Sequence, residues 1–382
     1  MTEKVKKIFF LAGEQSGDLH GALVIKQLKR IFPEVAVSGV GGSMMKEAGM
    51  ECIYSCDDLA VIGFIEVIKN IRRLMKIEKG IAEWLKKERP EMVVLIDYPG
   101  FNKRIAKIAK KLGIHVLYYI CPQVWAWHSS RVKEYTEIIS ESIVVFPFEV
   151  DIWRKAGGKV NYFGHPLIGV AKPEKTKSEF LSGLEITKTP VISLMPGSRK
   201  QEIGYILPEL LKTAKLILNE FADVQFILPL ASAIDDSLIN EYLIDSSLPI
   251  KVVRGQTYDA VAASDLCIVA SGTATLETAI IGTPMIVVYR VNWLTSFLSR
   301  YLIEAEHIGL PNVIAGKRII PEFIRDKFEA QLIAKEAVDI LKDKNRQKSM
   351  HESLNAVREK LGNPGAGERV AQYIAAKMRE FK

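Results

Sequence analysis

One acidic residue of the chain follows an apolar run in a way that suggests proton transfer. Asp97 comes directly after Met92–Ile96, a run with the composition of a buried strand. A carboxylate that is partly desolvated at a strand end has a raised pKa and can act as a general base. Asp97 could equally cap the helix predicted to follow it. The residue is therefore a candidate base, with helix capping as the alternative.

Two later segments have the composition of phosphate-binding loops. Gly197 and Ser198 can offer backbone N–H groups at a helix start, and Arg199 adds a cation for phosphate oxygens. Glu277 lies about one turn into a second predicted helix, where its carboxylate could accept from the two vicinal hydroxyls of a ribose. The small-residue loop before it is formed by Ser271, Gly272, Thr273, Ala274 and Thr275. It lacks the Gly-Lys-Ser/Thr sequence that reaches a triphosphate, so it favours a diphosphate; a simple capped helix start is the alternative for both segments.

A fourth polar loop lies near the beginning of the chain. Gly13–Asp18 joins an apolar run to an amphipathic segment, which predicts a strand, a glycine turn and a helix. The loop is not Gly-x-Gly-x-x-Gly, so dinucleotide binding is not favoured. It either contacts a substrate or forms a tight turn with Ser16 as the helix cap.

These loops require strands to position them. Short β-branched runs alternate with amphipathic segments, a pattern typical of βαβ units and mostly parallel sheets. A Pro- and Lys-rich break at Gly164–Lys188 separates two such series. Because ligands of parallel sheets bind beyond the carboxyl ends of the strands, the polar loops belong at the ligand edge. We expect an α/β protein with two Rossmann-like domains facing across a cleft, at residues 1–167 and 168–345, followed by C-terminal helices at 346–382.

The positive charge is concentrated in one part of the chain. The 382 residues carry a net charge of +7, yet Lys69–Lys111 alone contains 13 Lys or Arg and five acidic residues, a balance of +8. An apolar stripe overlaps this segment and includes Ile65, Ile68, Ile71, Leu74 and Met75. A basic amphipathic segment suits an anionic membrane surface, although a helix facing the core with a solvated basic side gives the same pattern.

Several classes of protein are excluded by composition. No apolar run is long enough to span a bilayer, and no signal-peptide core precedes Glu14. No Asp-x-Asp motif is present, so we expect no metal, and no groove-reading motif supports nucleic-acid binding. The four cysteines form no zinc or disulfide pattern, which is typical of a reduced, cytoplasmic protein. They are Cys52, Cys56, Cys121 and Cys267.

Nine segments in this order resemble the lipid-A-disaccharide synthases, a family of inverting glycosyltransferases of bacterial outer-membrane lipid synthesis. The resemblance covers nearly the whole chain, and nine segments in register make it specific. The segments are AGEQSGDLHGA, GVGGSMMKEAGME, DYPGFNKRIAK, CPQVWAWHSSRV, FPFEVDIWRKAG, FGHPL, MPGSRKQEI, ASGTATLETAIIGTPMIVVYR and LPNVIAG.

The resemblance implies a glycosyltransferase-B fold whose last helices cross back to the first domain. It implies transfer from UDP-2,3-diacylglucosamine to 2,3-diacylglucosamine 1-phosphate, which gives a β-1,6-linked disaccharide 1-phosphate and UDP. No metal and no organic cofactor are implied. Family members are peripheral on the cytoplasmic face of the inner membrane of Gram-negative-type bacteria and can form homodimers. Two diacylated substrates favour the membrane interpretation of the apolar stripe.

Roles for individual residues follow from the same resemblance. Asp97 would deprotonate the 6-hydroxyl of the acceptor, and Arg199 with the neighbouring backbone would neutralise the departing UDP. The 271–275 loop would hold the diphosphate and Glu277 the ribose. Asn312 matches a further motif position and is expected to line the cleft. The acceptor side would be lined by Glu14, Ser16, Gly17 and Asp18.

Two other functions are alternatives to this interpretation. A UDP-sugar 2-epimerase shares the two-domain architecture and the nucleotide loops, but it needs no acylated acceptor. A basic nucleic-acid-binding protein would show a steep dependence of binding on salt concentration.

Overall fold

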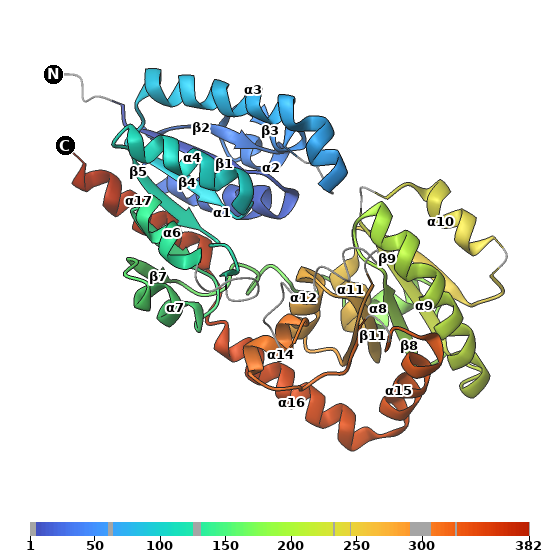
Figure 1. The fold of residues 1–382 in the computed structure, drawn as a ribbon. Helices are drawn as coiled ribbons and strands as arrows, with labels where there is room; N and C mark the ends of the chain where they lie inside the picture. Colours follow the sequence, from blue (N-terminus) through green and yellow to red (C-terminus); the bar gives the residue numbers. More distant parts are fainter. Residues whose placement is uncertain are drawn as a thin grey trace. The chain divides into compact units, whose positions relative to one another are not determined.

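The chain folds into two compact units. The computed structural model describes residues 5–59, 64–124, 131–231, 234–244, 246–290, 307–324 and 327–381, except for the side chains of residues 64–70. One unit comprises Met1–Pro166 together with Leu361–Lys382, and the other comprises Leu167–Lys360. Each is an α/β structure around one parallel sheet (Figure 1).

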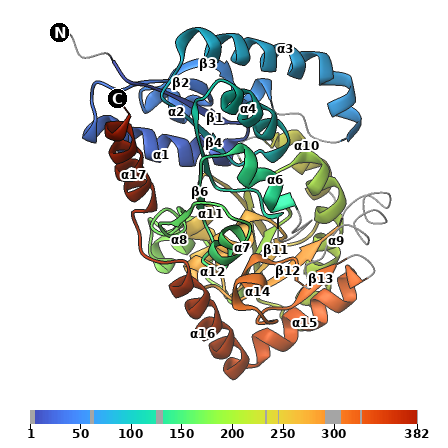
Figure 2. The ribbon, with the colours of Figure 1, turned by 60° about the vertical axis from the view of Figure 1, so that its left-hand side comes forward.

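The first unit is built on a seven-stranded parallel sheet with the order β3-β2-β1-β4-β5-β6-β7. Its strands are β1 (Lys7–Ala12), β2 (Ala36–Gly41), β3 (Glu51–Ser55), β4 (Met92–Ile96), β5 (His115–Tyr119), β6 (Glu141–Val144) and β7 (Val160–Tyr162). Its helices are α1 (Gln15–Ile31), α2 (Ser43–Glu47), α3 (Phe64–Glu88), α4 (Pro99–Lys111), α6 (Arg131–Ile138), α7 (Glu149–Lys155) and α17 (Ala366–Glu380). Helices α3 and α4 cover one face of the sheet, and α1 and α17 lie together on the other (Figures 1 and 2).

The second unit has a six-stranded parallel sheet with the order β10-β9-β8-β11-β12-β13. Its strands are β8 (Val191–Met195), β9 (Gln225–Leu230), β10 (Ile250–Arg254), β11 (Leu266–Ala270), β12 (Met285–Tyr289) and β13 (Glu322–Ile324). Its helices are α8 (Lys177–Gly183), α9 (Lys200–Glu220), α10 (Asp236–Leu243), α11 (Thr257–Ala263), α12 (Thr273–Ile281), α14 (Leu310–Ala315), α15 (Ala330–Lys342) and α16 (Lys344–Lys360).

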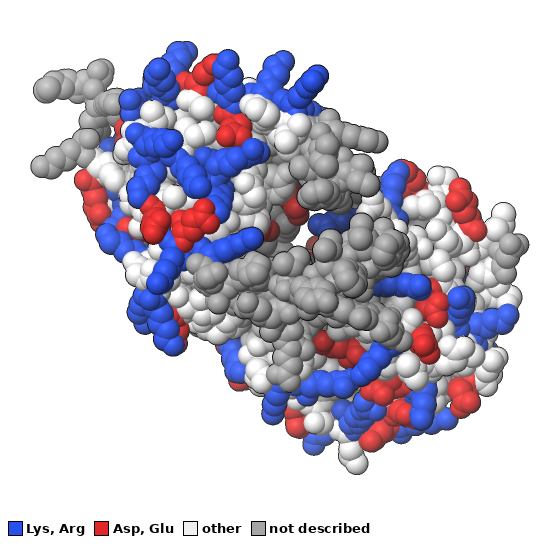
Figure 3. All heavy atoms as spheres, viewed as in Figure 1, with Lys and Arg blue, Asp and Glu red and all other residues white. Residues whose placement is uncertain are grey.

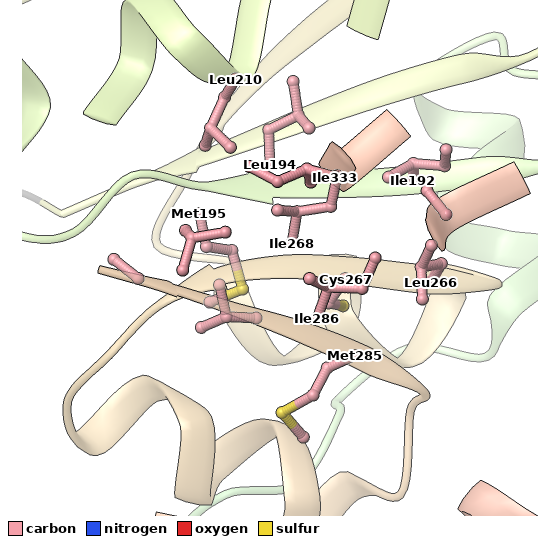
Figure 4. Packing of buried hydrophobic residues seen from close by; sticks show 14 of the residues in the cluster. Ile192, Leu194, Met195, Leu210, Leu266, Cys267, Ile268, Met285, Ile286 and Ile333 are labelled. Carbon is pink, nitrogen blue, oxygen red and sulfur yellow. The ribbon is translucent and has the colours of Figure 1, made fainter. Parts of the chain in front are cut away.

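The core of the second unit explains why its central strands are mostly apolar. Ile192, Leu194 and Ile268 lie with Leu210 of α9 and Ile333 of α15 on one face of the sheet (Figure 4). Helices α12 and α16 pack against each other as part of the same unit. A strand that is buried on both faces has no polar alternation, which is what β8, β11 and β12 show in the sequence.

The prediction of two Rossmann-like parallel sheets is confirmed. The extents of the units differ from the predicted domain ranges at the C-terminal end. Helix α16 belongs to the second unit, and the chain returns to the first unit only at Leu361. Helix α17 then packs on α1 and buries Val370, Ile374 and Met378.

One arginine joins the two stretches of chain at which the polypeptide leaves the first unit and returns to it. The guanidinium of Arg369 donates to the carbonyls of Phe163, Asn363 and Pro364 at 2.7–3.0 Å. The backbone N–H of His165 donates to the carbonyl of Leu361 at 2.8 Å. Residues 163–165 and 361–364 are therefore fixed side by side within the first unit.

The apolar stripe of α3 does not face one way, and the prediction for Leu74 is wrong. Leu74 is 6% exposed and packs into the core beside Ile77 and Ile81, because these residues share one face of the helix. Ile71 and Met75 are 46% and 58% exposed. The side chains of Ile65 and Ile68 lie outside the described residues. Within the part of the chain that the structure describes, no helix meets the length and apolarity that a membrane span requires.

The two faces of α3 give a test of this orientation. Leu74→Ser should lower the free energy of unfolding by roughly 2–5 kcal/mol, because it removes a buried side chain and buries a hydroxyl. Met75→Ser, one position along the same helix, should change it by no more than about 0.5 kcal/mol. Urea unfolding followed by circular dichroism measures both. Equal effects of the two substitutions would contradict the assignment of the faces.

Candidate functional site

The turn that carries Asp97 is held in an unusual backbone conformation. Asp97 and Tyr98 have φ values of 46° and 49°, in the left-handed region that residues other than glycine seldom adopt. The carbonyl of Asp97 accepts from Asn102 Nδ2 at 2.6 Å and from Tyr118 Oη at 2.7 Å. These two buried donors fix the turn between β4 and α4. Nothing in the sequence selects Tyr118, and Asn102 stands out only as part of the DYPGFNKRIAK motif.

Burial raises the pKa of the Asp97 carboxyl into the range suited to a general base. The pKa of Asp97 is raised to about 6, chiefly by desolvation and also by the negative charge of Glu14, while the backbone N–H of Tyr98 opposes the rise. A carboxylate with this pKa is ionised at neutral pH and holds a proton more firmly than an exposed aspartate does. Asp97 can therefore accept a proton from a substrate hydroxyl.

The polar segment that begins at Gly13 packs directly against the Asp97 turn. A Cβ atom on Gly13 would lie 2.3 Å from the ring of Tyr98, so only glycine permits this approach. The hydroxyl of Tyr98 donates to the carbonyl of Leu59 at 2.6 Å and holds the ring in place. Glu14, which precedes α1, and Ser16, in the first turn of α1, are exposed.

Two of the four residues expected on the acceptor side are buried and make structural contacts instead. Asp18 is 3% exposed, and its carboxylate accepts from the backbone N–H groups of Gly42, Met44 and Met45 at 2.7–3.1 Å. It therefore caps α2, where the helix N-terminus favours a negative charge. A Cβ atom on Gly17 would lie 3.1 Å from Ala12 Cβ, so this glycine serves the contact between α1 and β1.

In the second unit, the predicted phosphate nest at the start of α9 holds a carboxylate of the protein itself. The backbone N–H groups of Ser198 and Arg199 donate to Glu202 Oε2 at 3.1 and 3.3 Å. Arg199 Nη1 also donates to Glu202 Oε1 at 3.3 Å. Gly197 has a φ of 111°, and a Cβ atom there would lie 2.4 Å from Glu202 Oε2. The nest formed by residues 197–199 therefore binds an anion, and Glu202 supplies it.

The second phosphate loop presents a glycine and a helix N-terminus to solvent. Gly272 has a φ of 149° and precedes α12, and both Gly272 and Thr273 are exposed. Thr275 is buried, and its hydroxyl donates to the carbonyl of Gly272 at 2.8 Å. The backbone N–H of Ser271 donates to the carbonyl of Val288 at 2.8 Å. Of the five predicted residues, Thr275 thus shapes the loop, while Gly272 and Thr273 are accessible to an anion.

Glu277 lines a small cavity with a tyrosine that the sequence had not singled out. Tyr258 Oη donates to Glu277 Oε1 at 2.8 Å. Burial raises the pKa of Glu277, and the bond from Tyr258 opposes the rise. The cavity has a volume of about 270 Å³. It is lined by Lys172, Glu174, Gly255, Gln256, Thr257, Tyr258, Asp259 and Glu277.

The expectation that Asn312 lines a cleft is not supported by its contacts. Asn312 is fully buried, and its Nδ2 donates to Glu322 Oε1 at 2.7 Å and to the carbonyl of Ile320 at 2.9 Å. Its Oδ1 accepts from the backbone N–H groups of Ile319 and Ile320. The side chain ties α14 to the segment before β13, which is a structural role.

A spacing rule could have identified Glu202. A glutamate three residues after a helix cap often turns back to the backbone of the cap, and Arg199 and Glu202 have this spacing. No comparable signal marks Tyr258. Its partner lies 19 positions along the chain, in another helix.

Comparison with known proteins identifies the family. The model of the lipid-A-disaccharide synthetase family matches residues 8–376. Lipid-A-disaccharide synthase of Syntrophus aciditrophicus is 41% identical over 96% of this chain and 96% of its own. The enzyme of the same name from Geobacter metallireducens is 41% identical over 97% of this chain and 96% of its own.

A solved structure supports the fold. UDP-GlcNAc 2-epimerase from Neisseria meningitidis, bound to UDP-GlcNAc, has a TM-score of 0.62 and 12% identity, and the similarity covers 98% of this chain and 99% of that one. At this identity the likeness concerns architecture alone. The family match, in contrast, spans both units, the Asp97 turn and both phosphate loops. The chain belongs to the lipid-A-disaccharide synthetase family.

Proposed function

We propose that this protein transfers diacylglucosamine from UDP-2,3-diacylglucosamine to the 6-hydroxyl of 2,3-diacylglucosamine 1-phosphate. The products are the β-1,6-linked disaccharide 1-phosphate and UDP. The observation that carries the proposal is the family match over residues 8–376. Asp97, whose pKa is raised, would be the base that such a reaction needs.

The reaction requires one proton acceptor and a stabilised leaving group. The acceptor O6 forms a bond to the anomeric carbon of the donor while the bond from that carbon to the diphosphate oxygen breaks. Asp97 takes the proton from O6, and the electron pair of the broken bond remains on UDP. Attack from the face opposite the leaving group inverts the anomeric centre. The conformation of the Asp97 turn, fixed by Asn102 and Tyr118, keeps the base in one place.

The leaving diphosphate would be held by the second unit. Arg199 and the backbone N–H groups of Ser198 and Arg199 now donate to Glu202, and a bound phosphate would take the place of that carboxylate. The N-terminus of α12 at Gly272 and Thr273 offers a second set of donors. Glu277 would accept from the ribose hydroxyls.

A UDP-sugar 2-epimerase is the alternative, and its support is limited to the shared architecture. Incubation of the purified protein with UDP-diacylglucosamine, with and without the acylated acceptor, separates the two functions. Mass spectrometry should detect the disaccharide phosphate and UDP only when the acceptor is present. Release of an epimerised sugar without the acceptor would overturn the proposal.

The pKa of Asp97 leads to a specific pH dependence. Asp97 must be deprotonated to act, so kcat/KM should fall about tenfold per pH unit below about pH 6. Glu14→Gln removes the negative charge that raises this pKa, so the acid limb should move to lower pH. Ser16→Ala, in the same loop but without a change of charge, should leave the limb where it is. Asp97→Asn should lower turnover by at least about 100-fold. If Glu14→Gln leaves the pH of the acid limb unchanged, or if Asp97→Asn keeps full turnover, Asp97 is not the base.

Glu202 should compete with the nucleotide for the nest. Glu202→Gln keeps the side-chain shape but weakens its bonds to residues 198 and 199, so we expect UDP to bind about fivefold more tightly by calorimetry. Glu220→Gln, at the other end of α9, is the matched control and should leave the dissociation constant unchanged. Weaker UDP binding by Glu202→Gln would mean that Glu202 supports the nucleotide site rather than competing for it.

We propose further that α3 places the protein on an anionic membrane. Ile71 and Met75 are exposed one turn apart, and the cations Arg72, Lys76 and Lys79 are exposed around them. Figure 3 shows Lys and Arg side chains gathered over α3 and α4. Apolar side chains inside a basic surface suit the boundary between headgroups and acyl chains, where diacylated substrates lie.

Vesicle sedimentation tests the membrane proposal. The double variant Ile71→Ser/Met75→Ser should bind vesicles of phosphatidylglycerol and phosphatidylethanolamine about tenfold more weakly than the unaltered protein, because two apolar side chains no longer enter the bilayer. Leu332→Ser, at an exposed apolar residue of the second unit, is the control and should have no effect. Unchanged binding by the double variant would exclude this face of α3 as the membrane contact.

A further inference from the structure

We infer that Tyr258 is a positioning residue that holds the Glu277 carboxylate for the ribose and makes the site selective for ribonucleotides over 2′-deoxyribonucleotides. The inference deepens the proposed function and rests on it, because it takes UDP as the ligand of the second unit. It concerns only residues 167–360, which form one compact unit.

The hydrogen bond between the two side chains fixes the Glu277 carboxylate and still leaves it acceptor positions for a ligand. Tyr258 Oη donates to Glu277 Oε1 at 2.8 Å, and both residues line the 270 Å³ cavity. A glutamate side chain has several rotamers, and one firm bond selects among them. A carboxylate offers about four acceptor positions on its two oxygens. After one bond from Tyr258, enough positions remain for the 2′- and 3′-hydroxyls of one ribose.

The helix that carries Tyr258 is itself fixed in place. Asp259, the next residue, is 5% exposed, and its Oδ1 accepts from the backbone N–H groups of Glu174 and Lys175 at 2.7 and 2.8 Å. At the other end of α11, Thr283 Oγ1 donates to the carbonyl of Val261 at 2.8 Å. Because Thr283 follows α12, this bond joins the helices that carry the tyrosine and the glutamate. The positions of Tyr258 and Glu277 relative to each other are therefore fixed by the contacts of the helices that carry them.

The cavity has the size expected for part of a nucleotide. Its volume of about 270 Å³ is slightly below the usual range for pockets that hold a whole small ligand. Gly255 and Gln256 are among its lining residues, and Glu277 lies in the helix that begins at the exposed Gly272–Thr273 loop. A nucleoside in the cavity, with its diphosphate directed to that loop, uses both features.

Selectivity follows from the partial burial of Glu277. Burial already raises its pKa, which shows that water solvates the carboxylate incompletely. A ribonucleotide replaces the lost water with two hydroxyl donors, whereas a 2′-deoxyribonucleotide leaves one acceptor position unfilled. An unfilled position on a charged group weakens binding by about 10-fold or more.

The experiment compares UDP with 2′-deoxy-UDP by calorimetry on the full chain. The unaltered protein should bind UDP at least about 10-fold more tightly than 2′-deoxy-UDP. Tyr258→Phe should weaken UDP binding by about 10-fold and 2′-deoxy-UDP binding by less, so that the ratio falls to about 3 or below. Tyr242→Phe removes a tyrosine hydroxyl elsewhere in the unit and should preserve both affinities. Glu277→Gln, which keeps the side-chain shape, gives a second measurement of the ratio if Tyr258→Phe folds poorly.

Three outcomes would overturn the inference alone. A Tyr258→Phe protein with the unaltered ratio would show that Tyr258 does not position Glu277. An equal loss for both nucleotides would reduce its role to general stability. Equal binding of UDP and 2′-deoxy-UDP by the unaltered protein would remove the selectivity itself. Failure of the unaltered protein to bind UDP would instead overturn the proposed function and the inference together.

Discussion

Loops of both units depend on carboxylates that accept hydrogen bonds from backbone N–H groups. Asp18 holds the start of α2, Asp259 holds the segment before α8, and Glu322 holds the segment before α14 by accepting from Ile308 and Gly309. Removing a backbone donor from such a carboxylate would leave a desolvated charge, which costs several kcal/mol. The three segments that these carboxylates contact are therefore held in place by side chains of other elements.

The same interaction has a different consequence where the carboxylate is less buried. Glu202 accepts from two backbone N–H groups as Asp259 does, yet it lies at the surface of α9, where another anion can replace it. Asp97 and Glu277 have pKa values raised by burial, so proton transfer or a ligand hydroxyl can satisfy them. Asp18 and Asp259 are thus buried and hold the frame, whereas Asp97, Glu202 and Glu277 are partly exposed and suited to binding and chemistry.

The sequence was sufficient to predict the architecture and the Asp97 turn, because alternating strands and helices place strand ends at one edge of a sheet. It did not separate functional from structural polar residues. Asp18 and Asn312 lie in sequence motifs just as Asp97 does, and only their contacts reveal that they bind backbone groups. Leu74 was misassigned because a 3.6-residue period identifies a helix face but does not say what that face contacts. Tyr258 was missed because its partner is distant in sequence.

The return of the chain to the first unit has a consequence for biosynthesis. The apolar side of α1 is covered by α17, which contains the last residues of the described chain, and Lys6 Nζ donates to the carbonyls of Met378 and Phe381. During translation, the whole sequence of the second unit is synthesised before the first unit receives this helix. The unit that is synthesised first is thus completed last, and until then α1 exposes an apolar face on which chaperones or aggregation can act.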